Sequence, residues 1–265
     1  MIPTGRDLRF VLVAAAIAAS LAGCVSVEGT NRRQFNVLSV EQERAMGEEA
    51  YAEMLAETRV VSSGPMVEQV NRVGARLAAA TARRHPASAG AMRWQFAVIA
   101  EPEVNAWALP GGKCGVNVGL LEFVESDDEL AVVMGHEIAH AVARHGGERI
   151  SQSMAASIVG ELALGGLDPA VQQAVFAAYG LGVALPFSRS HEREADRLGL
   201  MIAAEAGYDP RAAISLWTRM AAQGGGGLEF LSTHPLPESR VEELQALIPE
   251  AEAVRQAAAV RAPRP

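Results

Sequence analysis

The chain contains little cysteine: two residues among 265, Cys24 and Cys114. Cys24 closes an N-terminal targeting pattern, and the single thiol that then remains cannot form an internal disulfide. Beyond the N-terminus, no apolar run reaches the ~18–20 residues that a membrane-spanning helix needs, which excludes an integral-membrane body. The net charge of −8 and the scattered basic residues give no positive surface for nucleic acid, so we expect no nucleic-acid partner.

The first 23 residues have the pattern of a lipoprotein signal peptide. A basic start and a short apolar stretch lead to Leu-Ala-Gly-Cys, a lipobox that ends at Cys24. We predict removal of residues 1–23 and lipid attachment to Cys24, which anchors the chain to the membrane; an ordinary signal peptide or an anchor helix is the alternative. Val25 stands where aspartate would retain a lipoprotein in the inner membrane, so the expected location is the periplasmic face of the outer membrane. Residues 24–38 are predicted to be a polar linker.

The most informative feature is the sequence His-Glu-Ile-Ala-His at 136–140, within a segment of helical apolar periodicity. Residues four apart on a helix share a face, so His136 and His140 can bind one zinc ion together. Glu137 then lies beside the metal and can accept a proton from the attacking water. The alternative is a helix with two surface histidines, but the flanks are apolar, and burying such a cluster is costly without a metal or hydrogen-bond partners. The pattern predicts hydrolysis of amide bonds.

A catalytic zinc needs a third protein ligand, and the segment 187–199 offers two glutamates. Glu192 and Asp196 are four residues apart in a second predicted helix and so share a face. Glu192 would bind the zinc, and Asp196 would accept the N–H of a ligand histidine. Glu194 is the competing ligand, and spacing alone does not decide between the two. Without the first motif, a solvated charged helix face would be the simpler interpretation.

Four segments resemble, in order, the gluzincin zinc metallopeptidases related to HtpX and the CAAX prenyl protease. They are N-A-x-A-L-P-G-G at 105–112, H-E-I-A-H at 136–140, S-R-x-x-E-x-x-A-D at 188–196 and T-H-P-x-P-x-x-R at 233–240. The resemblance extends from about residue 40 to residue 246. It is greatest to the soluble periplasmic lipoprotein members, of the BepA and LoiP type, and to the catalytic domain of the mitochondrial Oma-type protease.

The resemblance implies roles that the residues alone leave open. It selects Glu192 over Glu194 as the ligand that completes a site for one zinc ion per chain. It also implies catalytic roles for His234 and Arg240. In relatives, the histidine of T-H-P-x-P either supports the scissile carbonyl or blocks the open metal position in a latent form. Both roles are physically sound, because imidazole or guanidinium can stabilise an oxyanion and a neutral imidazole can take the place of water. Without the resemblance, His234 would be a turn histidine before a proline.

The remaining pattern predicts a mainly helical α+β fold. We expect one zinc metalloprotease domain over residues 39–265, with a small sheet whose edge strand lies beside the zinc-binding helix. Ser39 and Gln42 form a capping box that opens the first helix. Strands are predicted at 94–99, 105–109 and 113–118, and further helices at 64–82, 148–162 and 209–220 and after residue 238.

The segment 113–118 is the predicted edge strand, where an extended peptide can add to the sheet through backbone hydrogen bonds. This hypothesis, which the family resemblance supports, gives Asn105, Cys114, Gly115 and Val116 as substrate-binding residues. Cys114 is expected to be a buried structural cysteine and not a zinc ligand, with a redox role as the alternative. Unfolded or misassembled proteins are the expected partners, because folded ones cannot present an extended backbone.

The predicted function is therefore a zinc-dependent endopeptidase of the periplasm that hydrolyses peptide bonds in misfolded or unassembled envelope proteins. A second hypothesis is a latent, lipid-anchored chaperone or adaptor whose zinc site is plugged by His234. A third hypothesis, a purely structural lipoprotein, predicts no stoichiometric metal.

Overall fold

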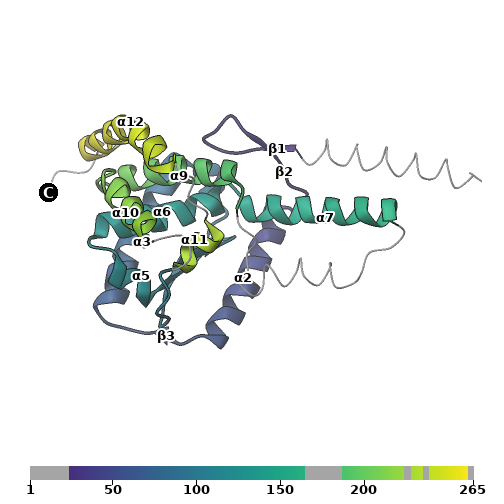
Figure 1. Ribbon diagram of the computed structural model, residues 1–265, viewed down its shortest axis with the longest axis horizontal. Helices are drawn as coiled ribbons and strands as arrows, with labels where there is room; N and C mark the ends of the chain where they lie inside the picture. The colour runs from purple at the N-terminus through teal and green to yellow at the C-terminus, as the bar shows by residue number, and fades with distance from the viewer. Residues whose placement is uncertain (1–23, 165–186, 224–227, 235–238, 262–265) are drawn as a thin grey trace, which may run out of the picture.

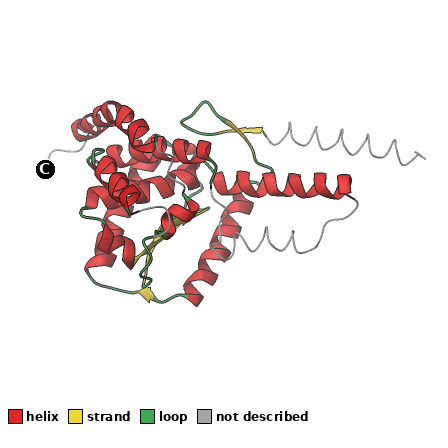
Figure 2. Cartoon of the chain, in the orientation of Figure 1, coloured by secondary structure: helices red, strands yellow, loops and turns green. Residues whose placement is uncertain are grey.

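The structure, a computed structural model, describes residues 24–164, 187–223, 228–234 and 239–261; the predicted signal peptide lies outside them. Helices dominate the described chain and surround a small sheet (Figures 1 and 2), so the predicted mainly helical α+β fold is confirmed. None of the described helices is both long and apolar enough to cross a bilayer. The elements are β1 (Cys24–Ser26), β2 (Arg33–Phe35), α2 (Val40–Glu57), β3 (Val60–Val61), α3 (Pro65–Arg84), α4 (Pro86–Ala89), β4 (Gln95–Ile99), β5 (Ala106–Leu109), β6 (Lys113–Asn117), α5 (Val118–Phe123), α6 (Asp127–Val142), α7 (His145–Leu164), α9 (Arg189–Glu205), α10 (Ala212–Ala222), α11 (Glu229–Thr233) and α12 (Arg240–Arg261).

The larger sheet has the strand order β3-β4-β6-β5. β6 pairs in parallel with β4 on one side and antiparallel with β5 on the other, and all five of its residues are buried. The prediction that 113–118 is the edge is therefore wrong, and β3 and β5 are the edge strands of the described sheet. The turn through Gly111 and Gly112, whose φ angles are 82° and 86°, folds β6 back onto β5. The pairing of β6 with β4 is non-local, so the alternation within 113–118 could not reveal it.

α6 carries the His-Glu-x-x-His motif through the centre of the domain. Ser126 caps its start, its side chain accepting from the Glu129 N–H at 3.2 Å, and the first turn is acidic, as the helix dipole favours. From Glu129 to Val142 every residue of α6 is buried. α6 contacts both β5 and α9, so the predicted placement of the edge strand beside the zinc-binding helix is correct, with β5 as that strand.

The N-terminal segment predicted as a linker packs against this centre. β1 and β2 form an antiparallel pair, and Val27 between them is buried with Ala139 of α6 and Leu198 of α9. Arg32 forms ion pairs with carboxylates of α7 and α9. Arg32 and Asn36 pair with buried carboxylates, so this stretch packs against the folded body.

The predicted start of the first helix is confirmed. The Ser39 hydroxyl accepts from the Gln42 N–H at 3.1 Å, and the Gln42 side chain accepts from the Ser39 N–H at 2.8 Å. α9 begins in a similar way, with the Ser188 hydroxyl accepting from the His191 N–H at 3.2 Å. These caps fix the first turns of α2 and α9, and the first turn of α9 holds Glu192.

Candidate active site

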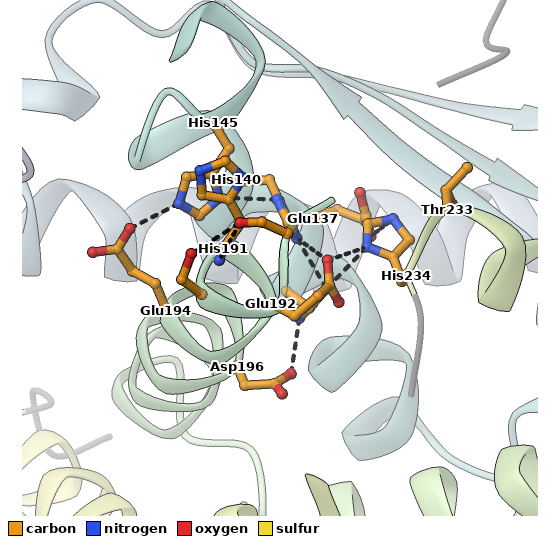
Figure 3. Close-up of polar contacts among 12 residues, drawn as sticks. Glu137, His140, His145, His191, Glu192, Glu194, Asp196, Thr233 and His234 are labelled. Atoms are coloured by element: carbon orange, nitrogen blue, oxygen red, sulfur yellow. Dashed lines mark hydrogen bonds and ion pairs between the residues drawn. The ribbon is translucent and has the colours of Figure 1, made fainter. Parts of the chain in front are cut away.

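Three side chains from two helices meet at the buried centre of the domain. His136 and His140 lie one turn apart on α6, and Glu192 comes from the first turn of α9. Figure 3 labels His140 and Glu192 at this centre. The Nε2 atoms of the two histidines are 3.1 Å apart, and each lies 3.4 Å from an oxygen of Glu192. The structure thus brings together the ligand set expected from the sequence.

His234, directly after α11, adds a fourth ligand atom, which is a nitrogen. Its Nδ1 atom lies 3.0 Å from Glu192 Oε1 and 3.3 Å from His136 Nε2. One ligand atom from each of the four residues lies within 4.8 Å of the others, and all four residues are buried. A tetrahedral zinc with bonds of about 2.0–2.1 Å holds its ligand atoms about 3.4 Å apart. The donor atoms and their spacing therefore fit a zinc ion.

Asp196 and Arg240 contact the ligands away from this centre. Asp196 Oδ1 lies 3.0 Å from His136 Nδ1, so it accepts the N–H and leaves Nε2 free for a metal. Arg240 donates to Asp196 at 2.6 Å and to Glu192 at 3.3 Å, and its guanidinium lies 3.7 Å from the centroid of the Trp217 ring. These contacts give Arg240 the position of a support for two carboxylates; its catalytic role stays a prediction.

The carboxylates of the cluster are held in the ionised form that a metal ligand requires. Burial opposes ionisation, yet the charge of His136 holds the pKa of Glu192 well below its usual range, and Arg240 lowers the pKa of Asp196. Burial also opposes the charged imidazole, but Glu192 and Asp196 raise the pKa of His136 to about 9. At His140 burial dominates, and the pKa lies well below the usual value.

Glu137 lies beside the ligands with one oxygen unused. The residue is buried, and burial raises its pKa. Its Oε1 has no hydrogen-bond partner within the described chain, although His234 Nε2 is 3.3 Å away. An unpaired buried oxygen needs a group to meet it, such as a water or a substrate atom. Glu137 therefore has the position and the proton affinity of a general base.

Two buried histidines next to the ligands, His145 and His191, were missed in the sequence (Figure 3). His145 Nδ1 lies 3.0 Å from His140 Nδ1, and burial lowers the pKa of His145 to about 4. Glu194 lies on this side, with its Oε2 2.8 Å from His145 Nε2, and is no member of the four-residue ligand group. Glu194 is therefore excluded as the alternative zinc ligand. The short interval between His140 and His145 was the available signal.

The predicted substrate-binding residues are divided between the interior and the margin of the sheet. Cys114, Gly115 and Val116 are buried in β6 between two partner strands, so they cannot pair with an added strand, and this prediction is wrong. Burial raises the pKa of the Cys114 thiol, and the expected burial of this cysteine is confirmed. Asn105 lies just before β5, and its buried Oδ1 has no partner in the described residues. Its role toward substrate stays a prediction.

Among the described residues, no strand pairs with the outer side of β5, which lies beside Glu137. The carbonyls of Asn105 and Leu109 accept hydrogen bonds from the β6 side. Because successive residues of an antiparallel strand alternate in direction, Ala106 and Ala108 direct their N–H and C=O groups outward. The Ala108 N–H also helps to lower the pKa of Glu137 against the effect of burial, so this edge runs next to the carboxylate.

A metal-dependent enzyme that hydrolyses peptide bonds is the class that this site defines, because its donor atoms fit zinc and a buried carboxylate faces them. Comparison with protein families agrees: residues 66–248 match the description Peptidase family M48. The chain belongs to peptidase family M48, and it is a zinc metalloendopeptidase.

Curated relatives come from mitochondria and from bacteria. The mitochondrial metalloendopeptidase OMA1 of Schizosaccharomyces pombe is 38% identical over 265 residues, covering 96% of this chain and 77% of the relative. The putative beta-barrel assembly-enhancing protease of Vibrio cholerae is 33% identical, covering 78% of this chain and 44% of the relative. The beta-barrel assembly-enhancing protease of Escherichia coli is 29% identical, covering 90% and 52%. The chain thus spans about half the length of these bacterial relatives.

Proposed function

We propose that the chain is a zinc-dependent endopeptidase that cleaves misfolded or unassembled proteins of the bacterial envelope. The meeting of His136, His140 and Glu192 beside the buried Glu137 is the observation that carries the hydrolytic activity. The envelope role draws on the names of the bacterial relatives, beta-barrel assembly-enhancing proteases, and on the lipobox that ends at Cys24.

One zinc ion, held by His136, His140 and Glu192, would act as a Lewis acid toward the scissile carbonyl and the attacking water. Glu137 takes a proton from that water and passes it to the leaving amine. Its raised pKa suits both steps, since the carboxylate must bind the proton before releasing it. Asp196 accepts the Nδ1–H of His136 and so directs Nε2 toward the ligand group.

Substrate would bind as an added strand on β5. The outward C=O groups of Ala106 and Ala108 and the outward N–H of Ala106 supply hydrogen bonds that do not depend on substrate sequence. The added strand would pass beside Glu137, because the Ala108 N–H interacts with that carboxylate. Only an extended chain can form such a strand, so unfolded or misassembled polypeptides fit this mode of binding.

The proposed location is the periplasm, with lipid on Cys24 anchoring the chain to the outer membrane. Cys24 begins β1, and Val27 just after that strand packs between α6 and α9. An anchor at Cys24 would therefore hold the active site close to the membrane surface. In cells fed labelled palmitate, Cys24→Ser should abolish labelling and release the protein from the membrane fraction. Labelling that survives this substitution contradicts the anchor.

The hydrolytic function is tested with Glu137→Gln in the purified full chain. We expect wild type and variant each to hold about one zinc by elemental analysis, and casein cleavage to fall by about 10²–10⁴-fold in the variant. Glu122→Gln, an exposed position on α5, is the matched control and should cleave normally. Turnover by zinc-replete Glu137→Gln would defeat the assignment of the base, and wild type that binds no zinc would defeat the function itself.

A second candidate is a latent state in which the chain is a lipid-anchored chaperone or adaptor. It is favoured by His234, whose Nδ1 lies within the ligand group and whose Nε2 lies 3.3 Å from Glu137. A neutral imidazole in the fourth metal position takes the place that water must enter. In this state β5 would bind an unfolded chain without cleaving it.

A further inference from the structure

His145 lies directly behind one of the zinc-site histidines, and hydrolysis as described leaves it without a role. Its Nδ1 is 3.0 Å from Nδ1 of His140, and its Nε2 is 2.8 Å from Glu194 Oε2. The side chain of His145 is fully buried. In Figure 3 the three side chains follow one another away from the ligand group. His145 therefore contacts His140 on the ring nitrogen that a metal would leave free.

A break in the backbone brings His145 to this place. α6 ends at Val142 and α7 begins at His145. Between them, Arg144 has a φ of 57° and is the only non-glycine residue of the described chain with a positive φ. On an unbroken helix, the fifth residue after His140 would be turned about 140° away from it. The Arg144 side chain donates to Glu43 at 2.9 and 3.0 Å, so surrounding contacts hold this backbone conformation.

The contacts assign the protons along this row. Nε2 of His140 faces the ligand group, so a neutral His140 carries its proton on Nδ1. Nδ1 of His145 must then accept, which leaves the proton of His145 on Nε2. That N–H donates to Glu194, whose carboxylate can only accept. Each ring therefore has one tautomer, and the direction of donation runs from His140 to Glu194.

The carboxylate at the end of the row is itself fixed. Arg32 Nε donates to Glu194 at 2.8 Å, and its Nη1 donates to Glu148 at 2.7 Å. His191 stacks on the His145 ring with centroids 4.4 Å apart, and its Nε2 lies 3.0 Å from Glu148. Arg32 occupies the space between the two carboxylates as their counter-ion. This cluster therefore supports His145, and it is not among the groups of described residues that could hold a metal ion.

We propose that His145 is a positioning residue that sets the tautomer and the ring orientation of the zinc ligand His140. Glu194 completes the arrangement by fixing the tautomer of His145. The proposal rests on the zinc site proposed above. A hydrogen-bond acceptor behind a ligand histidine raises the basicity of the ring and restricts its rotation, and its removal weakens metal binding by about 10–100-fold.

Two substitutions in the full chain distinguish the effect of losing the hydrogen-bond acceptor from the effect of changing the packing. His145→Phe keeps a ring of similar size and removes the acceptor, so we expect zinc affinity to fall by about 10–100-fold. His145→Asn places an amide oxygen near the position of Nδ1 and should recover most of that loss. His85→Phe is the matched control, because His85 is equally buried and lies apart from the ligand group; it should bind zinc as wild type does.

Zinc affinity is measured by competition with a chelating indicator, and ligand geometry by the visible spectrum of the cobalt-substituted protein, which should change in His145→Phe alone. Wild-type affinity in a folded His145→Phe overturns the proposal. So does an Asn variant that folds but binds no better than the Phe variant. Wild type that binds no zinc overturns the proposed function and this inference with it, whereas the other outcomes leave the proposed function standing.

A measurement on wild type covers the case in which His145→Phe does not fold. Long-range ¹⁵N–¹H spectra of zinc-loaded protein labelled at histidine report the tautomer of each ring, with His145 identified by the signals that His145→Asn lacks. We expect the proton of His145 on Nε2 and that of His140 on Nδ1. A proton found on Nδ1 of His145 overturns the proposal.

Discussion

Gly135 on α6 and Gly199 on α9 lie backbone to backbone. A Cβ atom added to Gly199 would lie 2.7 Å from the carbonyl carbon of Gly135, and one added to Gly135 would lie 2.9 Å from the Gly199 carbonyl oxygen. Neither helix can carry a side chain here without moving away from the other. This close approach allows His136, the residue after Gly135, to meet Glu192 and Asp196 of α9.

Gly199→Ala should therefore damage the metal site from a distance. We expect a loss of about 1–3 kcal/mol in the free energy of unfolding, because the added methyl meets backbone and not a movable side chain. Zinc affinity should fall as well, since the helices that carry the ligands separate. Thermal unfolding and zinc titration measure the two effects. Gly90→Ala, where a Cβ makes ordinary contacts, is the control; unchanged zinc affinity in Gly199→Ala would refute this account.

The local parts of this site could be predicted from the sequence. His136 and His140 share a helix face by spacing alone, and Ser39 with Gln42 marks a helix start by a pattern of two residues. The assignment of Glu192 as the third zinc ligand needed more than spacing, because spacing also allowed Glu194. Only the family resemblance distinguished the two glutamates. The structure shows why the two differ: Glu194 turns to His145 and Arg32.

The non-local parts could not be predicted. β6 has the composition of a strand, but nothing in its residues says that β4 takes its second side. The polar segment at 24–38 resembles a linker until Arg32 is seen between Glu148 and Glu194, more than a hundred residues away in the chain. Pairings of this kind depend on which elements the fold brings together, and a single sequence contains no periodic sign of them.

The position of His234 predicts that, in a large fraction of wild-type molecules, this histidine blocks the metal position that water must enter. His234→Ala removes the nitrogen next to Glu192 and leaves the ligands His136 and His140 in place. If the open form is a minority of about one molecule in ten, freeing it raises casein cleavage about tenfold. His85→Ala, at a buried histidine apart from the site, should not change cleavage. A collapse of activity in His234→Ala would instead assign this residue to stabilisation of the oxyanion.

Binding of substrate as a strand at the β5 edge predicts that N-methylation slows cleavage only at every second residue of the substrate. Peptides N-methylated at a residue whose N–H faces Ala106 or Ala108 lose one backbone hydrogen bond, so kcat/KM should fall about 3- to 10-fold for each such methyl. The same methyl one residue along points away from β5 and serves as the control. Cleavage that falls equally at every position would mean that the peptide does not add as a strand.

An ion pair outside the ligand group, between the buried Glu129 and the partly exposed Arg219, predicts how stability depends on pH. Burial opposes ionisation of Glu129, but Arg219, at 2.6 and 2.7 Å, lowers the pKa of this carboxyl below its usual 4.5. A group with a lowered folded-state pKa stabilises the fold above the unfolded-state pKa and loses that contribution as pH falls through the folded-state pKa. Glu129→Gln should therefore cost about 2 kcal/mol at pH 7, and the difference from wild type should shrink below about pH 4.5. Urea unfolding between pH 7 and pH 3.5 measures it, with exposed Glu122→Gln as the control; a difference that stays constant to pH 3.5 would show that the charge of Glu129 contributes nothing.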